Sequence, residues 1–192
     1  MLPQLGFFGS IAFSSIAWGV LASRYVWPQL RRRQGAEAFR PLLTIHTFRF
    51  VGLAFLVPGV VSPDLPHAFT ASAAAGDIVA AALALLALLS LRHAGGVLVV
   101  WLFNVWGSID LVNAFYEAHA TGLSPGQLGA AYFIPTLFVP LLLITHGLMF
   151  RLLVRRQEGP AIRQPAAHLT VPGDLSPCAS TTDAVVSCRS GR

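Results

Sequence analysis

Five ionisable residues of this sequence lie inside long apolar stretches, where a charged or titratable side chain is costly and therefore marks a functional hypothesis. Acids, an arginine and imidazoles in an apolar setting are the groups that hold a polar ligand, relay protons or ligate a metal. The five residues are Asp77, Asp110, Arg49, His46 and His146.

Asp110 is the most informative of these residues. It lies about 9 Å from the end of the apolar stretch 97–116 if that stretch is a helix. Its side chain then leans back toward the middle of the stretch, and the negative end of the helix dipole disfavours a carboxylate there. We expect Asp110 either to bind a proton or a ligand, or to join two helices through a hydrogen bond.

Arg49 and Asp77 each have two interpretations. Arg49 is either a side chain that snorkels to the polar boundary or an inward-facing group that pairs with an acid or an anionic head group. Asp77 either complements the positive end of the helix that it begins, or binds a ligand near the level of Asp110. Arg49 and Asp110 are separated by roughly 10 Å along the bundle axis if both segments are α-helices. We therefore expect a bridging ligand between them and no direct pair.

His46 and His146 lie at a matched depth on different stretches, each about four residues inside the same boundary. Two such histidines are able to act as axial ligands of a b-type haem, which would make the protein an electron carrier. They are equally able to bind a divalent ion or relay protons, or to be structural side chains that bond to backbone carbonyls. The sequence leaves these alternatives open.

Together the polar residues predict a pocket between the second, third, fourth and fifth apolar stretches, with Asp110 at its centre. The expected ligand is a small solute, coupled to proton binding, or a lipid head group. The expected lining is Asp77, Asn113 and Tyr132 in the outer half, and Arg49, His46 and Asn104, with His146, in the inner half.

Catalytic signatures are missing from the sequence, which contains no GxSxG, HExxH or phosphate-binding P-loop motif. This favours a binding or permeation protein over an enzyme. The remaining alternative is a structural or accessory membrane subunit, in which the polar residues only hold helices together.

The elements that must position these residues are five apolar stretches. A bilayer core of about 30 Å requires roughly 20 apolar residues in a helix. Hydrophobic residues make up 55% of the chain and charged residues only 11%, compared with about 25% charged residues in soluble domains. We predict an all-α membrane protein, a bundle of five transmembrane helices near residues 5–23, 42–60, 74–91, 97–116 and 129–150.

Arginines alternate between the loops. They occupy the loop after the first stretch, the turn after the third and the segment after the fifth, whereas the loops 61–73 and 117–128 contain none. By the positive-inside rule, the N-terminus is outside and the C-terminus is cytoplasmic. We expect a plasma membrane, specifically a bacterial inner membrane. No basic segment precedes the first stretch, so we expect a retained helix and no cleaved signal.

Residues 157–192 change character. They are rich in proline, serine and threonine, so we predict a disordered cytoplasmic tail that follows a transmembrane domain at 1–156. The two cysteines of the chain, Cys178 and Cys188, lie in this tail without the spacing of a metal knuckle or a disulfide framework.

The expected partner is the lipid bilayer. The net charge of +5 comes from arginines beside apolar stretches, which argues against nucleic acid. Small residues recur every four positions in the first stretch, at Gly6, Ser10 and Ser14, and in the third, at Gly76, Ala80 and Ala84. Such stripes allow close packing inside one bundle, or a homodimer.

Overall fold

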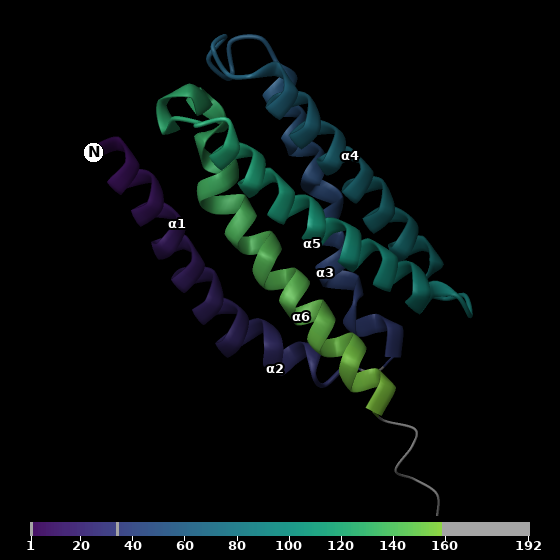
Figure 1. The fold of residues 1–192 in the computed structure, drawn as a ribbon. Helices are drawn as coiled ribbons and strands as arrows, with labels where there is room; N and C mark the ends of the chain where they lie inside the picture. The colour runs from purple at the N-terminus through teal and green to yellow at the C-terminus, as the bar shows by residue number, and fades with distance from the viewer. Residues whose placement is uncertain (1, 34, 159–192) are drawn as a thin grey trace, which may run out of the picture. The chain divides into compact units, whose positions relative to one another are not determined.

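A computed structural model describes residues 2–33 and 35–158, and this part of the chain is built from helices and turns (Figure 1). The tail predicted at 157–192 lies outside the described residues except for its first two positions, and so do Cys178 and Cys188. Four helices are long and apolar enough to cross a membrane: Leu2–Leu30, His67–Ser90, Gly96–Ala120 and Ile134–Arg156.

The long helices lie side by side, and α1 runs along α6 (Figure 1). The first long helix combines α1 (Leu2–Leu21), a π-helical turn η1 (Ala22–Val26) and α2 (Trp27–Leu30). The next elements are η2 (Gly35–Ala38), α3 (Arg40–Thr47) and η3 (Phe48–Leu56). They are followed by α4 (His67–Ser90), α5 (Gly96–Ala120), η4 (Pro125–Tyr132), η5 (Ile134–Phe138) and α6 (Val139–Glu158).

The second predicted stretch, 42–60, differs from the uniform helix that we expected. Only α3 is α-helical, and the nine residues of η3 form a 3₁₀ helix, which is long for this conformation. The buried residues of η3 are Arg49, Gly52 and Phe55. Because a 3₁₀ helix has three residues per turn, this spacing places all three on one face. An α-helix would turn each successive member of the row by about 60°.

Two apolar cores lie toward opposite ends of the bundle. The first joins α2, α3, α4, α5 and α6 and includes Phe103 and Met149, both fully buried. The second includes Phe55, Phe69 and Leu128. Along each segment that contributes to both cores, the buried polar residues lie between the residues of the first core and those of the second. For example, His46 and Arg49 lie between Leu43 and Phe55. The fold therefore holds its polar side chains at the middle of the bundle.

The small-residue stripes fall in two different settings. Ala80 and Ala84 on α4 are fully buried inside the bundle, so that stripe serves close helix packing. In contrast, α1 has no buried residue at all. The homodimer stays a prediction.

The loops at the end of the bundle away from the arginines are tied to each other. The Ser62 amide donates to the carbonyl of Gln127 at 2.8 Å, and the Ala130 amide donates to the carbonyl of Val60 at 2.9 Å. Gly129 has a φ of 51°, and a Cβ there would overlap the Val60 carbonyl oxygen, so only glycine fits. These bonds fix η4 against the loop that follows η3.

Candidate binding site

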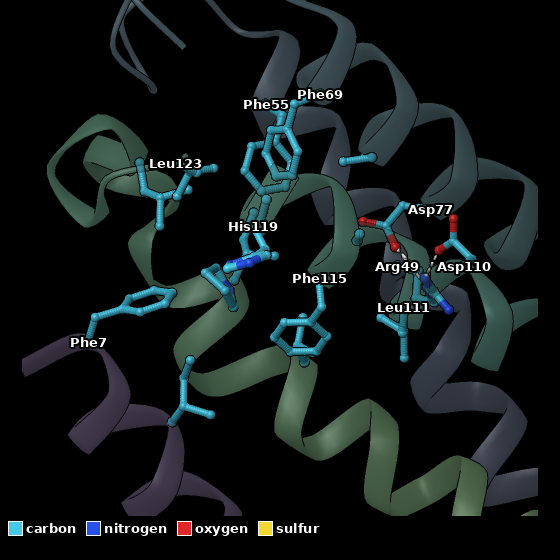
Figure 2. Close-up of a pocket in the computed structure, with 18 of the residues that line it drawn as sticks. Phe7, Arg49, Phe55, Phe69, Asp77, Asp110, Leu111, Phe115, His119 and Leu123 are labelled. Atoms are coloured by element: carbon cyan, nitrogen blue, oxygen red, sulfur yellow. Dashed lines mark hydrogen bonds and ion pairs between the residues drawn. The ribbon is translucent and has the colours of Figure 1, made fainter. Parts of the chain in front are cut away.

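Arg49 is the centre of the buried polar residues, and its side chain is fully enclosed. Its Nε donates to Asp77 Oδ1 at 2.8 Å, and its Nη2 lies 2.8 Å from the same oxygen. Nη2 also donates to Asp110 Oδ2, and Nη1 donates to the carbonyl of Gly107 at 3.2 Å. One guanidinium therefore joins η3, α4 and α5, as Figure 2 shows.

The direct pair between Arg49 and Asp110 corrects our expectation that roughly 10 Å of axial separation would keep them apart. That separation compared the backbone levels of the two residues. The long stem of the arginine and the carboxylate that leans back along α5 meet between those levels. The helical segment also begins at Arg40, two residues earlier than predicted, which carries Arg49 about 3 Å further into the bundle.

Glycines make the space for these side chains. A Cβ on Gly52 would lie 2.6 Å from Cγ of Asp77, and a Cβ on Gly76 would lie 2.6 Å from Cγ of Asp110. Real Cβ atoms do not approach other atoms so closely, so each carboxylate is seated against a glycine of the neighbouring helix. The spacing of glycines in the sequence indicated packing, but it did not reveal that the partners are carboxylates.

A cavity of about 250 Å³ lies beside the ionic centre. Its wall is mainly aromatic and aliphatic, with residues from α1, η3, α4, α5 and the region of η5. The three charged residues that line it are Arg49, Asp77 and Asp110. Its other apolar and aromatic lining residues include Phe7, Phe8, Phe55, Phe69, Leu111, Phe115 and Leu128.

Each carboxylate of the centre has one oxygen to spare. Asp77 Oδ2 and Asp110 Oδ1 accept no hydrogen bond from the described residues, and Figure 2 shows each acid with one oxygen turned toward Arg49 and the other turned away. The side chains of Asp77 and Asp110 remain 14% and 16% exposed, whereas that of Arg49 is 0% exposed. Arginine carries a single positive charge, so one negative charge is in excess at the cavity when both acids are ionised.

His46 and His146 do converge, and they form a second cluster on the other side of Arg49. Their ring centroids are 4.2 Å apart. His46 Nε2 is 2.9 Å from Thr145 Oγ1, and His146 Nδ1 is 2.7 Å from Asn104 Oδ1. Asn104 thus joins α5 to α6 through an interhelical hydrogen bond. Neither histidine lines the cavity.

This histidine pair does not fit a b-type haem. A haem iron lies between its two axial ligands. Two opposed metal–imidazole bonds of about 2 Å each separate the two ligating nitrogens by about 4 Å and the ring centroids by more than that, whereas these centroids are only 4.2 Å apart. Both residues are buried, 0% and 2% exposed, and both rings pack against Phe103, so the packing leaves no room for a porphyrin between them. Within residues 2–33 and 35–158, no group of three or more potential metal ligands gathers elsewhere.

Besides the two histidines, three of the predicted lining residues lie away from the cavity: Asn104, Asn113 and Tyr132. Asn113 is exposed, and its Nδ2 donates to Glu117 Oε1 at 3.0 Å. The Tyr132 hydroxyl lies 3.2 Å from Ser10 Oγ and connects η4 to α1. Both residues were placed in the pocket by their level in the bundle alone, and level does not determine on which face of the helix a residue lies.

His119 lines the cavity, although it lies beyond the predicted apolar stretch 97–116. The reason is that α5 continues to Ala120, four residues beyond the predicted end, so His119 lies on its last turn. On the same turn, Glu117 Oε1 accepts a hydrogen bond from Ser72 Oγ of α4 at 3.1 Å. Extending the predicted helix 97–116 by one turn would have placed both residues on it.

The chain belongs to a domain family of unknown function (DUF8737), whose model matches residues 6–154. No curated protein and no solved structure matches the chain. The matched range contains the ionic centre, the cavity lining and the histidine cluster. Because the family carries no assigned activity, the function has to be inferred from the site.

Proposed function

We propose that this protein is a multi-pass membrane protein that binds a small amphipathic solute or a lipid head group in the cavity beside Arg49, as a binding or permeation protein and not an enzyme. One observation carries the proposal: an ionic centre with two carboxylates for one guanidinium opens on an apolar cavity. Ligand sites typically combine an apolar wall with a few convergent polar groups. The apolar part of the ligand would contact the phenyl rings, and its polar group would reach Asp77 and Asp110.

A purely structural role explains this centre less well. Buried ion pairs are weak contributors to stability, because apolar residues of similar volume often stabilise a protein more. Asp77 and Asp110 also line the cavity, and each has one oxygen that accepts no bond from the described residues. These features favour a ligand role over the alternative of an accessory subunit.

We further propose that α3 and η3 together form a fifth crossing, with the N-terminus outside and the C-terminus cytoplasmic. Their eight α-helical and nine 3₁₀ residues span about 30 Å, the thickness of a bilayer core. Arginines gather at one end, where Arg151 and Arg155 lie over the ring of Trp27 at 4.1 and 5.1 Å. The positive-inside rule makes that end cytoplasmic, in a bacterial inner membrane.

A matched pair of cavity variants tests the binding proposal. Ala73 lines the cavity, whereas Ala75 on the same helix is exposed on the outside of the bundle. Ala73→Leu should fill part of the cavity and weaken the binding of 2-phenylethanol and 2-phenylethylamine at least tenfold, and Ala75→Leu should leave it unchanged. Titration calorimetry of the protein in nanodiscs measures the affinity, and thermal unfolding checks both folds. If the wild-type protein binds neither probe, the proposal is wrong.

A further inference from the structure

We infer that the ligand of this cavity is a small cation, an amine with an apolar body, and that it exchanges with a proton held by Asp77 and Asp110. The inference rests on the proposed function and specifies its ligand class and its coupling. It follows from the number of charges and the number of free hydrogen-bonding atoms at the site.

Each of the three guanidinium nitrogens of Arg49 already donates a hydrogen bond within the protein. Arg49 Nε, Nη1 and Nη2 all donate, to Asp77, to the Gly107 carbonyl and to Asp110. At most four of its five N–H groups are used by these partners, so an anionic head group would find one N–H on Nη1 and would meet two carboxylates. An ammonium group carries three donors and no acceptor. Asp77 Oδ2 and Asp110 Oδ1 pack against Gly52 and Gly76 and accept no bond from the described residues. The hydrogen-bonding atoms that the two acids leave open are therefore acceptors, which an ammonium complements.

The charges of the centre require one further positive charge. Two carboxylates and one guanidinium leave one negative charge in excess, and an isolated charge in an apolar environment is strongly disfavoured. One proton on the carboxylate pair neutralises the empty site, and one ammonium neutralises the loaded site. Binding the amine therefore releases the proton to water. Holding both would create an excess positive charge, and so the amine and the proton compete.

The surroundings of the pair also favour a cation. Five phenylalanines line the cavity, and the faces of their rings attract cations. The nearby titratable groups are Glu117 and His119 of α5 on the outer side, and His46 of α3 and His146 of α6 behind Arg49. His119 lines the cavity with the two acids. It must therefore be distinguished from them in any pH experiment.

Three probes with the same phenyl group separate charge from shape: 2-phenylethylamine as the cation, 2-phenylethanol as the neutral analogue and 3-phenylpropionate as the anion. We expect the amine to bind at least tenfold more tightly than the alcohol, and the anion to bind most weakly. The amine affinity should fall by up to about tenfold for each unit by which the pH is lowered, where the empty site holds its proton. Calorimetry in buffers with different ionisation enthalpies should detect up to one proton released per amine bound.

Single substitutions test which side chain binds the amine and holds the exchanging proton. Asp110→Asn should remove the advantage of the amine and the proton release while retaining 2-phenylethanol binding, and Asp64→Asn on an exposed loop should change neither. His119→Gln should retain the pH dependence. If Asp110→Asn does not fold, Asp77→Asn provides the same test.

The outcomes distinguish the two proposals. If the alcohol or the anion binds as tightly as the amine, or if the pH dependence disappears with His119, the cation inference is overturned while the binding proposal survives. If none of the three probes binds, the proposed function fails as well.

Discussion

Gly76 on α4 lies directly against the carboxylate of Asp110 on α5. The carboxylate occupies the space that a side chain at position 76 would fill. A Cβ at this position would lie 2.6 Å from Cγ of Asp110 and would push the carboxylate away from Arg49. Gly52 has the same relationship to Asp77. The ionic centre therefore depends on two glycines as much as on three charged residues.

Gly76→Ala should lower the free energy of unfolding by about 1–3 kcal/mol, the usual cost of forcing an extra carbon into a packed site. The matched control is Gly147→Ala on α6, where a Cβ would meet nothing within 4 Å. Alanine favours a helix over glycine by about 0.5–1 kcal/mol, so the control should be neutral or stabilised. Denaturant unfolding in detergent measures both variants. An equal effect of the two substitutions would contradict the seating of Asp110.

Arg49→Met should destabilise the protein much more than a surface substitution does. It leaves Asp77 and Asp110 without their shared donor, and removing one partner of a buried ion pair costs about 3–5 kcal/mol. This exceeds the loss of a single interhelical hydrogen bond, about 0.6 kcal/mol. The same unfolding measurement applies, and a loss below about 1 kcal/mol, typical of an exposed ion pair, would mean that Arg49 is not buried between the acids.

The triple variant Arg49→Met, Asp77→Asn, Asp110→Asn serves as the control for this cost. It removes all three charges at once, so no uncompensated charge is left inside the bundle. We expect it to recover most of the stability that Arg49→Met loses, since apolar or neutral replacements of buried ionic groups are often well tolerated. If the triple variant is no more stable than Arg49→Met, the cost comes from packing of the arginine stem and not from the charges.

The parts of the site that could be predicted from the sequence are the charged residues of the apolar stretches. Arg49, Asp77 and Asp110 could be identified because a charged side chain within an apolar stretch is energetically costly. The structure brings the three residues together. The same argument selected His46 and His146, whose rings also meet. Hydropathy likewise located the four long helices, because the thickness of the bilayer fixes their length.

The remaining features depend on backbone geometry that hydropathy does not encode. The spacing of His46, Arg49, Gly52 and Phe55 is three residues throughout, and all four are buried. In a uniform α-helix each successive member of this row would turn by about 60°, so the four residues would not share one face. Faces, and not levels, decide which residues share a cavity, which is why Asn113 and Tyr132 were grouped with Asp110 although they contact other partners.

The histidine pair leads to a spectroscopic prediction. Because the rings of His46 and His146 lie 4.2 Å apart and are buried, titration with hemin should not produce the spectrum of a haem with two histidine ligands. Any Soret shift from adventitious binding should be unchanged in His46→Ala. A low-spin spectrum that disappears in His46→Ala would instead establish the electron-carrier alternative. Hemin with an unrelated membrane protein in the same detergent provides the baseline.

The crossing by α3 and η3 can be tested with three single-cysteine variants in a background with Cys178→Ser and Cys188→Ser. Glu37, Asp64 and His93 are exposed and flank α3–η3 and α4 in turn. If residues 40–56 cross the membrane with the N-terminus outside, a membrane-impermeant maleimide should label intact cells at Asp64→Cys. The variants Glu37→Cys and His93→Cys should react only after permeabilisation, because the arginine-rich end is cytoplasmic. If α3–η3 does not cross, positions 37 and 64 share one side and position 93 lies on the other, so identical labelling at 37 and 64 would rule out the fifth crossing.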